Sequence, residues 1–256
     1  MKNKSNIIYL LGAGRSGTTL LATVLNSHPK VQTLGEMHQF LEHISLDKLC
    51  SCGEHLNKCS FWSKVVKDLD FTEEELLKLT VLSDEMERHL NIPRLFLTAK
   101  VDSEYQNLQF RIFNAIANHS STEWQLDSSK YIARYLMFRK NKKINTKGIY
   151  LVRDVRGVIH SFSKQVQTSK NPLSSIIYYS LINFFGQLMC WFDKSIIKVK
   201  YEDFVACPSD TLNDIYNHVF DENNSLSNMN SVFDMPHIIG GNRMKANKKI
   251  KISSDM

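Results

Sequence analysis

The stretch IIYLLGAGRSGTTLLATVL, from Ile7 to Leu25, decides the fold. It begins with a short apolar run rich in β-branched residues and continues through a glycine-rich turn. It ends in a segment whose apolar residues recur at helical spacing, at Leu20, Leu21, Val24 and Leu25. This order predicts a strand, a loop and a helix. In such a loop, backbone N–H groups and the helix N-terminus are suited to hold phosphate oxygens.

The loop keeps the spacing of the nucleotide-triphosphatase loop G-x-x-x-x-G-K-[ST] but not its cation. Gly12 and Gly17 occupy the two glycine positions, whereas Thr18 occupies the lysine position. The cation lies three residues earlier, at Arg15. The sequence therefore disfavours a standard ATPase and still indicates an anion-binding loop.

The rest of the chain alternates predicted strands with predicted helices. Short apolar runs predict strands at 31–34, 124–126, 149–152 and within 195–203. Capping and breaking residues predict helices from Thr72 to about Leu90, from Asp102, after Asp127, after the 149–152 strand, from Pro172 to Trp191, and from Pro208. We expect an α/β protein with a P-loop-like three-layer fold, in which helices flank a central, mostly parallel sheet of about five strands. We expect one domain over residues 1–256.

The amino-acid composition excludes several classes of protein. The 256 residues are 43% hydrophobic and 23% charged, which excludes a disordered, collagenous or disulfide-framework chain. The balance of 32 Lys and Arg against 26 Asp and Glu gives a net charge of +6, which suits an anionic ligand. No stretch approaches the roughly 18 apolar residues of a membrane span, and the run at 7–11 is too short for a signal-peptide core. We expect a soluble, cytoplasmic chain.

Two motifs carry a resemblance to a known family. Arg15-Ser16-Gly17-Thr18-Thr19 fits the [KR]-S-G-T-T loop of sulfotransferases that use 3′-phosphoadenosine 5′-phosphosulfate (PAPS). That family also carries an Arg at the end of a strand and a Ser eight residues later, and Arg153 and Ser161 have this spacing. The resemblance implies that the loop holds the 5′-phosphosulfate and that Arg153 and Ser161 contact the 3′-phosphate.

Further segments resemble the carbohydrate- and protein-tyrosine-type branch of the family, in a bacterial-like form. They are N-S-H-P at 26–29, L-G-E at 34–36, D-S-S-K at 127–130, K-Y-E-D at 200–203 and G-G-N-R-M-K at 240–245. Where the family usually has an Arg after G-N-x-x, this chain has Lys245, which can meet a phosphate but not bidentately. The chain stops soon after this motif, which is compatible with a missing C-terminal helix.

Sulfuryl transfer from PAPS needs an acceptor hydroxyl, in-line geometry and positive charge near the leaving group, and that scheme requires no metal. The resemblance implies Arg15 for leaving-group stabilisation, Glu36 as general base and Lys130 as a contact to the transferring sulfate. Glu36 could instead be a solvated loop carboxylate, and Lys130 a surface lysine at a helix start. His28 and His38 are rival bases, for which we favour structural roles, and His237 is a weaker rival.

A cysteine-rich segment gives a separate alternative. Cys50, Cys52, His55 and Cys59 could supply four zinc ligands, yet the spacing C-x-C-x-x-H-x-x-x-C lacks the usual C-x-x-C pairs. A disulfide such as Cys52 to Cys59 would require an oxidising compartment. Free thiols in a loop that frames the acceptor cleft are the simplest interpretation.

Three functions remain open from the sequence. The leading one is a PAPS-dependent sulfotransferase acting on a carbohydrate, lipid, peptide or small-molecule hydroxyl. The others are a P-loop nucleotide or small-molecule kinase and a non-catalytic nucleotide- or polyanion-binding module. Residues 243–251 carry five cations, which we interpret as lining a cleft for the cofactor or for an anionic acceptor rather than as binding nucleic acid.

Overall fold

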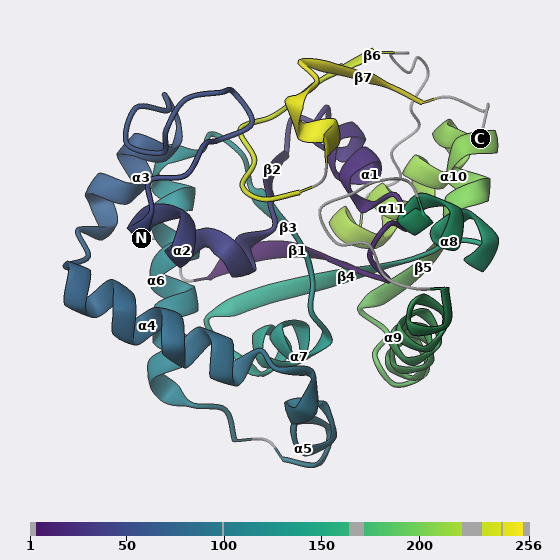
Figure 1. Ribbon diagram of the computed structural model, residues 1–256, viewed down its shortest axis with the longest axis horizontal. Helices are drawn as coiled ribbons and strands as arrows, with labels where there is room; N and C mark the ends of the chain where they lie inside the picture. The colour runs from purple at the N-terminus through teal and green to yellow at the C-terminus, as the bar shows by residue number, and fades with distance from the viewer. Residues whose placement is uncertain (1–3, 99, 164–171, 222–231, 242, 253–256) are drawn as a thin grey trace.

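A five-stranded parallel sheet forms the centre of the molecule (Figure 1). The computed structural model describes residues 4–98, 100–163, 172–221, 232–241 and 243–252. The strand order is β2-β3-β1-β4-β5, with β1 Ser5–Leu11, β2 Val31–Gly35, β3 Trp124–Lys130, β4 Ile144–Val152 and β5 Ile196–Lys200. A second, antiparallel sheet pairs β6 (Val232–Asp234) with β7 (Lys249–Lys251).

Helices connect these strands. The α-helices are α1 Thr18–Leu25, α2 Phe40–Ser45, α3 Trp62–Leu69, α4 Glu73–Met86, α5 Ile92–Leu97, α6 Ser103–His119, α7 Ile132–Lys140, α8 Val155–Ser163, α9 Pro172–Phe192, α10 Tyr201–Ala206 and α11 Pro208–Phe220. Short 3-10 helices lie at η1 Met37–Gln39, η2 His89–Asn91 and η3 Arg243–Ala246. Within the described ranges, no helix combines the length and apolar character required to cross a bilayer.

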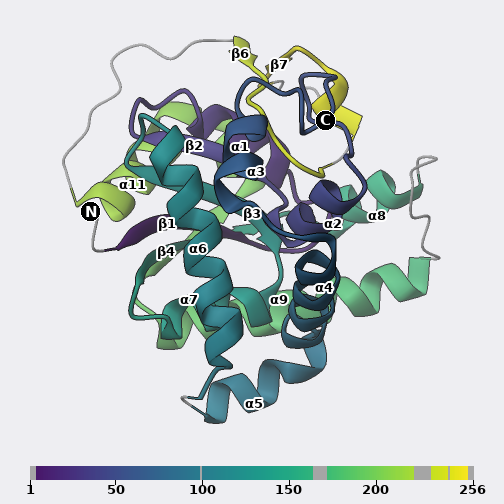
Figure 2. The same ribbon diagram turned by 90° about the vertical axis from the view of Figure 1, so that its left-hand side faces the viewer.

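The two faces of the sheet bury separate hydrophobic clusters. Successive side chains of a strand point to opposite faces, so Tyr9 and Leu11 of β1 join one cluster while Ile8 and Leu10 join the other. The first cluster is completed by α3, α4, α6, α7 and α9, and the second by α1, α10 and α11. Figure 2 shows α4 and α6 side by side on the first face. The predicted three-layer α/β fold is confirmed.

The connections after β1 and β4 leave the sheet in opposite directions. From β1 the chain passes through α1 to the edge strand β2, and from β4 it passes through α8 and α9 to the other edge, β5. Because α1 and α9 cover opposite faces, the loops that follow β1 and β4 diverge at the carboxyl ends of two adjacent strands. Open α/β sheets bind their ligands at such a position.

The C-terminal segment returns to the carboxyl end of β2. Ile239 forms a backbone bridge with Gly35, and the Glu36 N–H donates to the Ile239 carbonyl at 2.8 Å. The Ile239 N–H donates in turn to the Leu34 carbonyl at 2.9 Å. Gly35 has a φ of +87°, and a Cβ atom there would lie 2.2 Å from the Ile239 oxygen. Only glycine permits this approach, which fixes the backbone that leads to Glu36.

Candidate functional site

The glycine-rich loop joins β1 to α1, as the sequence predicts. Gly12 has a φ of +141°, and a Cβ there would lie 2.4 Å from the Leu151 carbonyl oxygen of β4. Gly17 precedes α1 with a φ of +93°, and a Cβ there would lie 2.3 Å from the Tyr201 ring. Both glycines are therefore required by backbone conformation and by close neighbours.

The loop offers unused hydrogen-bonding groups to an anion. The Ser16 hydroxyl is buried and hydrogen bonds to no other described residue. Gly17 provides no side-chain cap for α1, and the first turn of α1 has no acidic residue. A buried hydroxyl without a partner and an uncapped helix N-terminus both fit a bound phosphate or sulfate group. Thr18 and Thr19 are buried in the same first turn.

Arg15, Arg153 and Ser161 come together beside this loop. The Arg15 Nε atom donates to the Ser161 hydroxyl at 3.0 Å, and Arg153 Nη1 donates to the Arg15 carbonyl at 3.3 Å. The Arg153 guanidinium lies 4.3 Å from the centroid of the Tyr201 ring. The Tyr179 hydroxyl donates to the Arg153 carbonyl at 2.7 Å. Residues from two distant motifs therefore form one basic corner at the ends of β1 and β4.

Glu36 and Lys130 form an ion pair at the ends of β2 and β3. The distance from Lys130 Nζ to Glu36 Oε1 is 2.5 Å, and the two side chains are only 16% and 18% exposed, respectively. Gln39 Nε2 donates to the other carboxylate oxygen of Glu36 at 3.0 Å, and Lys130 Nζ also donates to the Ser128 carbonyl at 3.1 Å. These contacts hold a carboxylate and an ammonium group together at the carboxyl end of the sheet, where the glycine-rich loop also lies.

The backbone is strained at two of these residues. Among the described residues, the non-glycine positions with positive φ are Arg15, Asp47, Asp70, Lys130 and Asp221. Aspartate tolerates the left-handed conformation, whereas lysine and arginine adopt it rarely. The two residues that are not aspartate, Arg15 and Lys130, are both candidate cations of the site, with φ values of 71° and 70°. Such outliers concentrate at functional sites.

A buried polar network lies behind Lys130. The Asp127 carboxylate accepts from Arg134 Nε at 2.9 Å and from the Ser129 N–H at 2.9 Å. Arg134 also pairs with Glu87 at 2.5 Å, and burial raises the pKa of that carboxyl. The Ser129 hydroxyl accepts from the His38 N–H at 3.0 Å. This network connects the 127–130 segment to the backbone two residues after Glu36.

The structure places the rival bases in other environments. His28 packs against Tyr216 and Phe220 of α11, with ring centroids 4.5 and 4.6 Å away, which is a structural role. His38 lies next to the site, but burial lowers its pKa to about 3. A group with so low a pKa is a weak general base at neutral pH. His237 lies among the cysteines rather than at the sheet edge.

The C-terminal basic motif is described only in part. Asn242 lies outside the described residues, whereas Lys245 belongs to η3. Burial lowers the pKa of His43, and the positive charges of Lys48 and Lys245 lower it further, which places Lys245 near α2. The structure therefore groups Lys245 with the segment after Glu36, whereas the basic corner involves α8.

Three site residues were not predicted. Gln39 binds Glu36, the Tyr178 hydroxyl accepts from the Gly14 N–H at 3.1 Å, and the Tyr201 ring packs on Arg153. Tyr201 lies in the K-Y-E-D segment, so the resemblance could have indicated it. The sequence holds no comparable signal for Tyr178, which reaches the loop from α9.

The fold and the loop define an α/β protein with a glycine-rich loop between its first strand and first helix. A model of the sulfotransferase family matches residues 8–220, and the chain belongs to that family. The protein is thus a sulfotransferase.

Two solved structures show the same fold. The sulfotransferase domain from the curacin biosynthetic pathway is 18% identical, with a TM-score of 0.52 over 86% of this chain and 75% of that chain. The sulfotransferase domain from the Synechococcus PCC 7002 olefin synthase is 21% identical, with a TM-score of 0.51 over 86% of this chain and 74% of that chain. A comparison with curated protein sequences finds no match.

Proposed function

We propose that this sulfotransferase uses PAPS as donor and transfers the sulfuryl group to an acceptor hydroxyl. The observation that carries the proposal is the convergence of Arg15, Arg153 and Ser161 beside a loop whose Ser16 hydroxyl has no other described partner. A donor with phosphate groups at both ends of its ribose needs two anion sites a short distance apart. The loop and the basic corner provide them.

Each end of the donor has its own residues in this proposal. Ser16, Gly17, Thr18 and Thr19 hold the 5′-phosphosulfate through the loop and the N-terminus of α1. Arg153 and Ser161 hold the 3′-phosphate, and the Tyr201 ring orients the Arg153 guanidinium for bidentate binding. Lys245 stays a prediction, because its described electrostatic neighbour is His43.

Glu36, Lys130 and Arg15 carry the transfer. The acceptor hydroxyl attacks sulfur, its proton passes to the Glu36 carboxylate, and the bond from sulfur to the bridging oxygen of the donor breaks. Lys130 stabilises negative charge on the sulfuryl oxygens, and it reaches them from a position fixed by Glu36 and the Ser128 carbonyl. Arg15 and the loop N–H groups stabilise the departing phosphate.

The acceptor approaches from the side of α2 and α4 in this proposal. Two adjoining hollows of about 380 and 580 Å³ share His38 and Asp84. One also contains Gln39, which binds Glu36, and the other contains Tyr131, which follows Lys130. One hollow is therefore lined by a residue that contacts the proposed base, and the other by the residue next to the proposed cation. Because the residues for donor and acceptor lie along one sheet edge, we propose a single catalytic domain.

Titration with nucleotides tests the donor. We expect adenosine 3′,5′-bisphosphate to bind at least tenfold more tightly than ATP or AMP in isothermal calorimetry, because only the bisphosphate occupies both anion sites. A kinase predicts a preference for ATP, and a general polyanion-binding module predicts little preference. Either of those results would overturn the proposal.

A further inference from the structure

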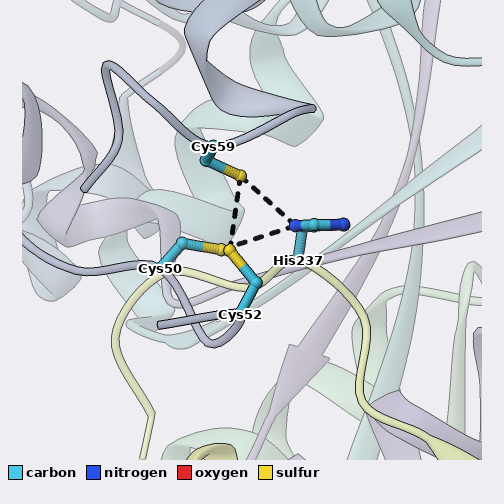
Figure 3. A group of neighbouring side chains, drawn as sticks. All are labelled: Cys50, Cys52, Cys59 and His237. Atoms are coloured by element: carbon cyan, nitrogen blue, oxygen red, sulfur yellow. Dashed lines mark hydrogen bonds between the residues drawn. The ribbon is translucent and has the colours of Figure 1, made fainter. Parts of the chain in front are cut away.

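Four potential metal ligands meet away from the sheet edge. The side chains of Cys50, Cys52, Cys59 and His237 point toward one another (Figure 3), and their ligand atoms all lie within 4.8 Å of one another. The cysteines come from the loop before α3, whereas His237 follows β6 nearly 180 residues later. His55, the ligand that the sequence suggests, is not part of the group, because its ring bonds to the Asp47 carbonyl at 2.5 Å.

The distances are those of a tetrahedral site. Zn–S bonds of about 2.3 Å and Zn–N bonds of about 2.0 Å place two sulfurs about 3.8 Å apart, and a sulfur and a nitrogen about 3.5 Å apart. The Cys52 and Cys59 sulfurs are 3.8 Å apart, and the Nδ1 atom of His237 lies 3.8 Å from Cys50 Sγ and 3.2 Å from Cys59 Sγ. All three cysteines are free thiols.

We propose that Cys50, Cys52, Cys59 and His237 bind one zinc ion that has a structural role. Three thiolates and an imidazole are a ligand set that selects zinc over magnesium, calcium or manganese. The four protein ligands fill a tetrahedral shell and leave no position for a reacting water, so the ion takes no part in catalysis. Cys50 and Cys59 are buried, at 3% and 0% exposure, which protects the ion from solvent.

The four ligands come from two segments, the cysteine loop and the C-terminal segment, which hydrogen bonds already hold together. The Ser51 hydroxyl donates to the Pro236 carbonyl at 2.5 Å and accepts from the Ile238 N–H at 2.9 Å. The indole N–H of Trp62 donates to the His237 carbonyl at 3.0 Å. These hydrogen bonds preorganise the four ligand atoms, and the ion would add a cross-link between the cysteine loop and the C-terminal segment.

The cross-link has a consequence for Glu36, and this step rests on the proposed function. His237 lies two residues before Ile239, whose carbonyl accepts from the Glu36 N–H. The zinc ion would thus hold the strand-like segment that fixes the backbone of the general base. Loss of the ion should lower kcat with an acceptor more than it lowers affinity for the donor.

Metal analysis of the full-length chain tests the site. We expect about one zinc per chain after purification without a polyhistidine tag or chelator. Cys52→Ser, at an exposed ligand, and His237→Gln should each lower the zinc content at least tenfold. Cys207→Ser and His55→Gln are the matched controls, since Cys207 and His55 are exposed and lie outside the group, and both should keep the metal.

Cobalt provides a readout that does not depend on folding of the variants. Cobalt(II) added to the metal-free wild-type chain should produce the thiolate charge-transfer band and the intense visible bands of a tetrahedral complex, and zinc should abolish them. Wild-type protein without stoichiometric zinc that also gives no cobalt bands would overturn the proposal. A Cys52–Cys59 disulfide in the freshly isolated chain, seen as a mass two hydrogens lower, would overturn it as well.

A third measurement separates this proposal from the proposed function. Removing the metal should lower the melting temperature of the protein, because the ion binds only the folded arrangement of ligands. Binding of adenosine 3′,5′-bisphosphate should change less than threefold. Failure of the untreated protein to bind that ligand would contradict the donor and leave the metal result intact.

Discussion

Glu36 is held by two neighbours whose roles differ. Lys130 neutralises the carboxylate, and Gln39 orients it. Glu36→Gln keeps the shape of the side chain but removes the proposed base. We expect donor affinity within about threefold of wild type and a loss of at least about a hundredfold in kcat, which is within the range for general-base catalysis. Steady-state kinetics with any accepted hydroxyl compound measures both. Normal turnover by Glu36→Gln, with an inactive His38→Ala variant, would assign the base to the histidine.

Lys130, the proposed contact to the sulfuryl group, has an unfavourable backbone conformation. Its φ of 70° costs a residue with a Cβ atom about 1 kcal/mol, and glycine avoids that cost. Lys130→Ala and Lys130→Gly both remove the ammonium group, so both should lose activity. The glycine variant should be more stable than the alanine variant by about 1 kcal/mol in urea denaturation. Equal stabilities would show that the backbone there is not strained.

The sequence predicted individual site residues where a known motif specifies their positions. The R-S-G-T-T loop and the Arg153–Ser161 spacing identified residues that the structure brings together. The choice of His55 as the fourth potential ligand was wrong, because the ring of His55 turns to Asp47 and His237 takes its place. Spacing along the chain finds only ligands that are near in sequence. His237 becomes a neighbour through a fold that no local pattern encodes.

Arg153 lies in the connection between β4 and α8, and its substitution tests whether this connection binds the 3′-phosphate of the donor. Arg153→Ala should weaken binding of adenosine 3′,5′-bisphosphate by about 1.5 to 3 kcal/mol, the range for a charge-assisted hydrogen bond. It should barely change binding of a nucleotide without the 3′-phosphate. Arg156→Ala, three residues along, is the matched control, because Arg156 is 89% exposed and pairs with Asp154. Equal losses for both nucleotides would assign Arg153 a structural role.

Elements with a strong local signal were predicted, and weaker ones were missed. The capping box at Thr72 is present, with the Glu75 N–H donating to the Thr72 hydroxyl at 3.2 Å, although α4 ends at Met86 rather than near Leu90. Pro93 lies in the first turn of the separate helix α5, where proline is favoured. The short strands β6 and β7 were missed as well, because three residues carry no periodicity.

Burial of His38 makes the stability of the protein depend on pH. Burial lowers its pKa from the usual 6.5 to about 3, so between these values the unfolded chain binds a proton that the folded chain does not. This contribution to stability is complete above pH 6.5 and is lost as the pH falls toward 3. Between pH 8 and pH 5 the loss should reach up to about 2 kcal/mol.

Urea denaturation at both pH values measures the effect. His38→Gln should lose less stability on acidification than the wild type. An unchanged pH dependence in His38→Gln would show that this ring is protonated as easily in the folded chain as in the unfolded one.

The bridge between Gly35 and Ile239 also sets an order of assembly during synthesis. The N-terminus leaves the ribosome first. The glycine-rich loop and β2 therefore emerge before Ile239, which pairs with Gly35, has been synthesised. A nascent chain that ends shortly after β5 contains the glycine-rich loop but lacks Ile239, whose carbonyl accepts from the Glu36 N–H. Binding of the proposed donor should therefore appear on ribosome-bound chains before catalytic competence, which waits for Ile239 to leave the ribosome.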